Sequence, residues 1–291
     1  MTRERTIERV ITAHQQQEGA GFVVRRPIPT AGVEHIDPFL LLDEMGPVAY
    51  GPGEALGAPD HPHRGFETVT YILEGSVEHE DSAGHRGRIG PGDVQWMTAG
   101  AGIVHSEEPL AEVRAQGGRA HGFQIWVNLP ARLKMTKPRY QEVQAARIPR
   151  VASPDGKAHG VIIAGEALGV RAVIDTYTPI VYQDWTLAPG GEVSIAISAD
   201  HRAMVYAFEG AIEVAGQSIR DGQLAILGEG EVVRLQSAAS GRALLLAGVP
   251  LREPVARYGP FVMNTEAELV QAVRDFQAGR MGEIARAPIA H

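Results

Sequence analysis

The sequence contains no cysteine, so disulfide bridges, thiolate nucleophiles and cysteine metal ligands are all excluded. No apolar run reaches the roughly 18 residues that a membrane-spanning helix needs. Positive charge is also scarce, with 27 Lys and Arg against 35 Asp and Glu. An acidic chain without a basic stripe is a poor direct binder of nucleic acid. The N-terminus has no apolar signal core, so we expect a cytoplasmic location.

Glycine and proline are abundant, at 34 and 19 of the 291 residues, which favours many turns and short strands over long helices. Strand-like segments rich in β-branched and aromatic residues recur at short intervals, for example at 66–73, 94–97 and 123–127. Short strands separated by frequent turns are typical of a β-sandwich or β-barrel. The sequence therefore predicts an all-β fold.

The second half of the chain echoes the first, because residues 204–210 match residues 69–75 in the order of their residue types. Such a repeat predicts two similar β-barrel domains of the jelly-roll type. We expect an N-terminal metal-binding barrel at 1–132, a connection at 133–150, and a C-terminal barrel at 151–291. This last domain is expected to carry the terminal helix.

The helix is predicted near the C-terminus by local signals. Thr265 and Glu268 have the spacing of a capping box, and Leu269, Val273 and Phe276 then recur at helical intervals. We interpret this segment as one amphipathic helix that packs on a barrel.

Two residue pairs predict a metal site. His61 and His63 are alternate residues of an expected strand, so both side chains point to one face with their Cα atoms about 6.6 Å apart. His105 and Glu107 repeat this spacing with a carboxylate. Two such pairs on adjacent strands place four ligands on one inward face. Without cysteine, the donors suit iron, manganese, nickel, copper or zinc.

Glu67 competes with Glu107 for the carboxylate position. Glu67 lies four residues after His63, about 13 Å along a regular strand, which is too far unless a bulge intervenes. Gly65 could supply such a bulge. Glu107 is much nearer to His105, so strand geometry favours Glu107 as the ligand. Glu67 is then expected to be a nearby carboxylate that takes a proton from the substrate as a general base.

Five stretches of the sequence resemble the pirins, a branch of the cupin superfamily. They are the blocks 37–44, 61–71 (HPHRGFETVTY), 91–100 (PGDVQWMTAG), 105–107 (HSE) and 259–265 (GPFVMNT). The resemblance covers nearly the whole chain. It implies a bicupin fold with one mononuclear iron(II), or another divalent transition metal, in the N-terminal barrel.

The resemblance also implies the ligand set, since the three histidines and one glutamate of the family fall on His61, His63, His105 and Glu107. One departure is visible: the residue before Pro59 is Ala58, where pirins often carry Phe. We therefore expect a wider, less aromatic pocket mouth.

The second barrel lacks the metal motif. The repeat places Ala196 and Ser198 where the first two histidines would be, and Arg234 and Gln236 near the other pair. None of these is an adequate metal ligand, so the C-terminal barrel is predicted to be a degenerate copy.

Two functions of different classes follow. Pirins are associated with quercetin 2,3-dioxygenase activity, which implies a metal-dependent dioxygenase acting on a flavonol or another aromatic hydroxy-ketone. Pirins also act as partners of transcription factors or metabolic enzymes, which implies an iron-binding regulator whose redox state controls a protein partner. The native metal, the physiological substrate, the partner and the oligomeric state are not determined by the sequence.

Overall fold

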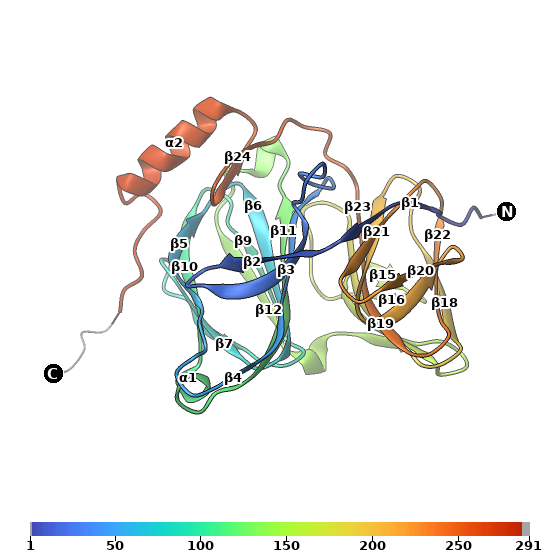
Figure 1. Cartoon of the computed structure of the whole chain (residues 1–291). Helices are drawn as coiled ribbons and strands as arrows, with labels where there is room; N and C mark the ends of the chain where they lie inside the picture. The colour runs from blue at the N-terminus through green and yellow to red at the C-terminus, as the bar shows by residue number, and fades with distance from the viewer. Residues whose placement is uncertain (1, 287–291) are drawn as a thin grey trace. The chain divides into compact units, whose positions relative to one another are not determined.

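The computed structural model describes residues 2–286, and they form a mostly β protein (Figure 1). The chain divides into two compact units. The first, here the C-terminal barrel, comprises the chain up to His14, Arg25–Leu40 and Ala146–Leu251. The second, here the N-terminal barrel, comprises Gln15–Val24, Leu41–Ala145 and the chain from Arg252 on. The two expected barrels are present.

The contiguous boundaries expected at 1–132, 133–150 and 151–291 differ from these units at both ends of the chain. Strand β1 (Ile7–Thr12) pairs antiparallel with β21 (Gln223–Leu227) of the C-terminal barrel. Helix α2 (Glu266–Gln277) was expected with the C-terminal barrel but belongs to the N-terminal one. Both differences arise from pairing between residues that are far apart in the sequence.

Two sheets build the N-terminal barrel. The seven-stranded sheet has the order β12-β9-β6-β11-β4-β3-β2, and the four-stranded sheet has the order β5-β10-β7-β8. Strand β3 runs from one unit into the other. The bounds are β2 His14–Glu18, β3 Phe22–Ile28, β4 Phe39–Tyr50, β5 Ala58–His63, β6 Phe66–Glu74, β7 Val77–Asp81, β8 Arg86–Ile89, β9 Val94–Thr98, β10 Ile103–Pro109, β11 Gly118–Asn128 and β12 Arg139–Val143.

Short elements complete this barrel. They are the helix α1 (Ala111–Gln116), the 3₁₀ turn Ala131–Leu133, the hairpin of β24 (Ala256–Tyr258) and β25 (Phe261–Met263), and helix α2. Helix α2 packs on both hairpin strands. The predicted capping box is confirmed, because the Thr265 side chain accepts a hydrogen bond from the Glu268 amide and the Glu268 side chain bonds back to Thr265.

The C-terminal barrel contains a ten-stranded sheet whose main path is β1-β21-β19-β23-β17-β14-β13. Its core is made of buried apolar side chains, among them Trp185, Val205 and Leu245 on three neighbouring strands. The bounds of β1 and β21 are given above. The remaining strands of this unit are β13 Arg150–Ala152, β14 Ala158–Ala164, β15 Glu166–Ala167, β16 Val170–Arg171, β17 Ile180–Leu187, β18 Gly191–Ala196, β19 Arg202–Val214, β20 Gln217–Arg220, β22 Val232–Ser237 and β23 Gly241–Gly248. A further 3₁₀ turn, Ala145–Arg147, lies where the sequence passes from one unit to the other.

The turn between β5 and β6 requires glycine. Gly65 has φ of +90°, and a Cβ there would come within 2.0 Å of the Val262 carbonyl oxygen on β25. Gly65 therefore makes a tight turn and a close backbone contact, and it does not form the bulge considered from the sequence. The buried Lys134 ammonium secures this contact by donating to the carbonyl oxygens of Gly65 (2.8 Å) and Val262 (3.0 Å).

None of the helices within residues 2–286 is long and apolar enough to cross a membrane.

Candidate metal centre

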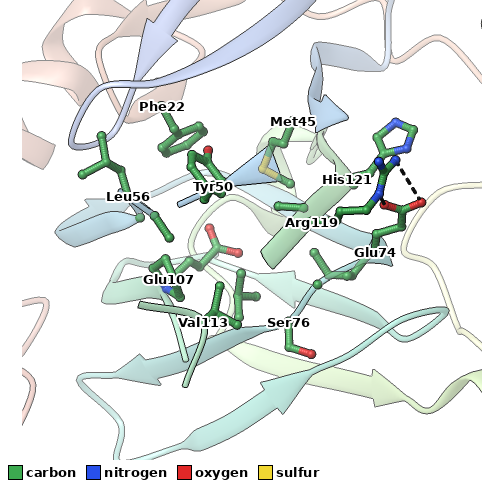
Figure 2. Close-up of a pocket in the computed structure, with 18 of the residues that line it drawn as sticks. Phe22, Met45, Tyr50, Leu56, Glu74, Ser76, Glu107, Val113, Arg119 and His121 are labelled. Carbon is green, nitrogen blue, oxygen red and sulfur yellow. Dashed lines mark hydrogen bonds and ion pairs between the residues drawn. The ribbon is translucent and has the colours of Figure 1, made fainter. Parts of the chain in front are cut away.

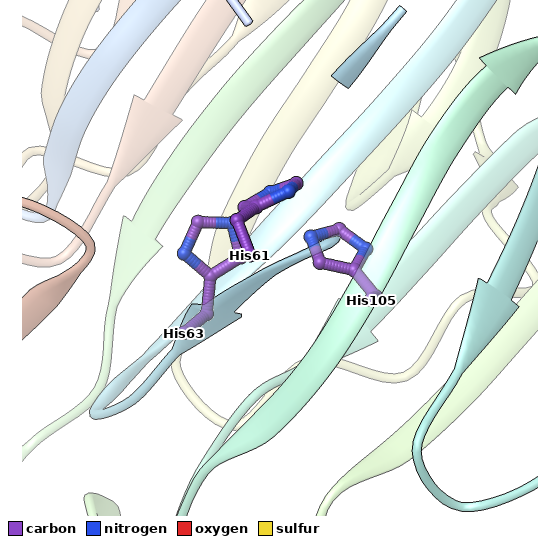
Figure 3. Close-up of side chains that lie close together, drawn as sticks. All are labelled: His61, His63 and His105. Carbon is purple, nitrogen blue, oxygen red and sulfur yellow. The ribbon is translucent and has the colours of Figure 1, made fainter. Parts of the chain in front are cut away.

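Three histidine side chains converge inside the N-terminal barrel (Figure 3). His61 and His63 lie on β5 and His105 on the neighbouring strand β10, where His105 pairs directly with His61. One nitrogen from each ring falls within 4.8 Å of the others. Among the residues that the structure describes, this is the one group of three or more potential ligands that meets this distance. The sequence prediction that these three residues come together is confirmed.

The hydrogen bonds of the first two rings determine which nitrogen carries the proton. The Nδ1 atoms of His61 and His63 face the carbonyl oxygens of Pro59 (2.7 Å) and Pro260 (3.4 Å). A carbonyl only accepts, so each Nδ1 is the protonated nitrogen and each Nε2 carries a lone pair. The two Nε2 atoms lie 3.1 Å apart. Two lone pairs at this distance repel unless a cation lies between them.

Burial keeps the rings neutral. His63 and His105 are 3% and 1% exposed. Burial, followed by the charge of neighbouring imidazoles, lowers the pKa of both rings well below the ordinary value of 6.5. Both are therefore neutral at pH 7, and His105 Nε2 is buried without a hydrogen-bond partner in the described chain. Three imidazoles with convergent ring nitrogens fit a divalent transition metal.

Glu107, the predicted fourth ligand, lies outside the three-histidine cluster. The register of β10 against β5 shifts between His105 and Glu107, so these residues do not continue a regular strand. The Glu107 carboxylate accepts a hydrogen bond from the Thr70 hydroxyl of β6 at 2.8 Å. Its place as a ligand stays a prediction.

Glu67, the predicted general base, is also not brought to the cluster. It is 1% exposed, and its carboxylate accepts a hydrogen bond from the Thr98 hydroxyl at 2.6 Å. Side chains alternate along a strand. Thr70 contacts Glu107, and Phe66 packs edge-on against His63 at 5.1 Å. Glu67 has the opposite parity to both residues, so it points to the other face of β6.

An apolar pocket of about 100 Å³ opens beside Glu107. Figure 2 shows the Glu107 carboxylate among Phe22, Tyr50, Leu56 and Val113, away from the ion pair of Arg119 and Glu74. Ala58 lines the same pocket, so the absence of an aromatic ring at that position does affect this wall. The pocket therefore combines a mostly apolar lining with the Glu107 carboxylate on one side and the Arg119–Glu74 ion pair on the other.

The sequence did not identify Thr70 or Trp126 as part of the site, whereas His121, just before the strand at 123–127, was a candidate for the pocket wall. Thr70 holds Glu107, and Trp126 packs on His63 at 5.2 Å. His121 lines the pocket and bonds the buried Glu44 carboxylate at 2.9 Å. His121 and Trp126 lie in a strand without a recognisable motif, so only the alternation of the sheet could have indicated them.

The C-terminal barrel has no comparable cluster among residues 2–286. Arg234 and Gln236, which the repeat placed opposite two of the ligands, both bond the Glu192 side chain on β18. The positions that correspond to His105 and Glu107 therefore hold surface polar contacts in the C-terminal barrel.

Comparisons with known proteins cover both barrels. A family model described as Pirin matches residues 21–127, and one described as Pirin C-terminal cupin domain matches residues 182–282. The chain is 44% identical to human pirin over 279 residues, which is 94% of this chain and 92% of that protein. It is 43% identical to a pirin-like protein of Solanum lycopersicum over 286 residues, 97% and 94% of the two chains.

A solved structure extends the comparison to three dimensions. The crystal structure of quercetin 2,3-dioxygenase from Acinetobacter baumannii superposes with a TM-score of 0.90 at 38% identity, covering 97% of this chain and 100% of that one. The predicted bicupin architecture is confirmed.

Proposed function

The chain belongs to the pirin family, and on that premise we propose that it is a mononuclear iron protein with dioxygenase activity of the quercetin 2,3-dioxygenase type. The observation that carries the proposal is the cluster of three imidazoles on β5 and β10, two strands that also contribute Ala58 and Glu107 to the wall of an apolar pocket. The structure of the Acinetobacter baumannii protein named quercetin 2,3-dioxygenase supports it.

His61, His63 and His105 would hold the metal, with Glu107 as the proposed fourth ligand. A divalent iron with open coordination positions supplies redox chemistry with dioxygen and Lewis-acid activation of a chelating hydroxy-ketone or catechol. Three imidazoles and one carboxylate leave such positions open, whereas structural metal sites are usually closed.

The protein's own groups prepare the substrate. Phe22, Tyr50 and Leu56 give the pocket wall an apolar surface that fits a flat aromatic ring and excludes water. The Thr70 hydroxyl holds one oxygen of the Glu107 carboxylate at 2.8 Å. The Glu107 carboxylate borders the apolar part of the pocket, so a substrate hydroxyl would meet it there. The base role predicted for Glu67 is not favoured by its position on the far face of β6.

Oxygen consumption tests the proposal. Protein reconstituted anaerobically with iron should consume oxygen when quercetin is added, and metal-free protein should not. His105→Ala should abolish uptake, while His201→Ala in the C-terminal barrel, outside the cluster, should leave it unchanged.

Iron-replete protein that consumes no oxygen across a panel of flavonols and catechols would refute the dioxygenase proposal. The alternative is then the iron-binding regulator, for which binding of a protein partner should depend on iron oxidation and occur without turnover.

A further inference from the structure

A fourth histidine lies against the metal cluster from the side opposite the metal position. His79 is on β7, its side chain is fully buried, and it pairs across the ladder with Glu107 on β10. Its Nδ1 lies 3.5 Å from Nδ1 of His105, and the ring centroids are 5.3 Å apart. His79 thus contacts the one histidine of the cluster that has no backbone carbonyl on its Nδ1.

The three histidines of the cluster are therefore oriented by two kinds of partner. Pro59 and Pro260 offer carbonyl oxygens to His61 and His63, and a carbonyl accepts a hydrogen bond in every state. His105 instead faces an imidazole, which accepts or donates according to where its own proton sits. The hydrogen bond at His105 Nδ1 therefore depends on which of the two rings carries its proton on Nδ1.

We propose that His79 is a positioning residue that holds His105 in the form with its proton on Nδ1, so that Nε2 presents a lone pair to the metal. Figure 3 shows one ring nitrogen of His105 turned toward His61 and His63. Since Nδ1 faces His79, the nitrogen turned toward the cluster is Nε2, which has no partner in the described chain. If Nδ1 of His105 accepted from His79 instead, Nε2 would carry the proton and could not ligate.

The consequence for His79 is visible in its surroundings. When its Nδ1 accepts from His105, its own proton lies on Nε2, which is buried without a hydrogen-bond partner within residues 2–286. The ring edge there packs against the Tyr140 ring at 5.0 Å. His79 thus keeps a buried Nε2 without a hydrogen-bond partner. In the proposed arrangement, this unpaired nitrogen accompanies the orientation of His105 Nε2 toward the metal.

This inference rests on the proposed metal site but not on the dioxygenase reaction. Partners that orient a metal-bound histidine typically change metal affinity by about 10–100-fold when they are removed. The readout is therefore the dissociation constant for Fe(II), added anaerobically to metal-free protein in competition with a coloured chelator.

Two substitutions at His79 separate orientation from packing. His79→Leu keeps apolar volume but offers no acceptor, and it should weaken Fe(II) binding by about 10–100-fold. His79→Asn places an oxygen at the distance of Nδ1 from the backbone, and it should restore most of the lost affinity. The matched control is His85→Leu on the same hairpin, since His85 is exposed, pairs with Asp81 and should leave Fe(II) affinity unchanged.

Two further measurements exclude a purely structural role. The thermal unfolding midpoints of the metal-free variants should not follow the order of their Fe(II) affinities, because the proposed effect of His79 is on metal binding and not on stability. ¹⁵N spectra of the histidine rings should show His105 protonated on Nδ1 in the wild type and a mixture of forms in His79→Leu.

His79→Leu with wild-type affinity, or His79→Asn no better than His79→Leu, would overturn the inference. A protein that binds Fe(II) but consumes no oxygen would refute only the proposed function, because the test of His79 measures binding alone. A wild type that binds no Fe(II) would refute both.

Discussion

A largely buried ion pair between Arg64, the residue after β5, and Asp275 joins helix α2 to the histidine strand β5. Removing this ion pair is a quantitative test of the structure. Arg64 directly follows His63 and donates through Nη1 to the Asp275 carboxylate at 2.7 Å and through Nε to the Ala101 carbonyl at 2.7 Å. The two side chains of the pair are 5% and 14% exposed. The Arg64 hydrogen bond, followed by that of Gln271, lowers the pKa of Asp275 from 3.8 to about 2.

The magnitude follows from this shift. A pKa lowered by nearly two units corresponds to about 2 kcal/mol of stabilisation at neutral pH. Replacing Asp275 with Asn also leaves the buried Arg64 charge without its counter-ion, and breaking a buried pair in this way costs about 3–5 kcal/mol. Because Asn still offers an oxygen to Arg64, we expect Asp275→Asn to lower the free energy of unfolding by about 2–4 kcal/mol.

The dependence on pH has a definite sign. The pKa of Asp275 is lowered in the folded protein, so its stabilisation is fully present above the unfolded pKa near 4. It is lost as the pH falls through about 2. The difference in stability between wild type and Asp275→Asn should therefore stay constant from pH 5 to pH 8 and shrink below pH 4.

Denaturant unfolding of metal-free protein measures the total effect, and hydrogen exchange of the α2 amides locates it. The matched control is Asp221→Asn, which breaks an ion pair of similar length, 2.8 Å to Arg25, whose side chains are 50% and 22% exposed. Such an exposed pair is worth about 0–1 kcal/mol. An Asp275→Asn effect no larger than that of Asp221→Asn would refute the view that burial gives the Arg64 pair its strength.

The other predictions concern the metal. Elemental analysis should find one metal per chain, and His61→Ala or His105→Ala should remove most of it, because each loses one of the few donors; a second metal retained by the C-terminal barrel would contradict this. Glu107→Ala should release more metal than Glu67→Ala, measured by the same analysis, and the reverse order would show that the carboxylate ligand was wrongly assigned. Glu67→Gln should keep the metal. If this variant consumed oxygen about 10²–10⁴-fold more slowly than the wild type, Glu67 would be the general base, although it faces away from the cluster.

Local sequence signals predicted local structure well. The spacing of Thr265 and Glu268 determines the start of α2, because both capping bonds form between residues three apart. The paired spacing of His61 and His63 likewise placed two ligands on one face, because side chains alternate along a strand.

Features that depend on strand phase or on distant pairing were not accessible from the sequence. Glu67 faces away from the cluster because of its parity on β6, which the motif does not reveal. His79 belongs to no recognisable motif, and only the pairing of β7 with β10 places it beside His105. Strand β1 belongs to the C-terminal barrel and helix α2 to the N-terminal barrel. Both assignments depend on contacts between residues far apart in the sequence, which no local pattern predicts.

His63 and Arg64, at the end of β5, are contacted by residues from the last part of the chain, and this has a consequence for biosynthesis. The Pro260 carbonyl that faces His63 lies 197 residues downstream of it, and Asp275 lies 211 residues downstream of Arg64. At translation rates of about 5–20 residues per second, roughly 10–40 s separate the synthesis of each member of these pairs from that of its partner. A nascent chain that already carries all three histidines still lacks the contacts that orient His63. Correct metallation is therefore a late event, and a ribosome-bound or C-terminally truncated chain should bind metal poorly.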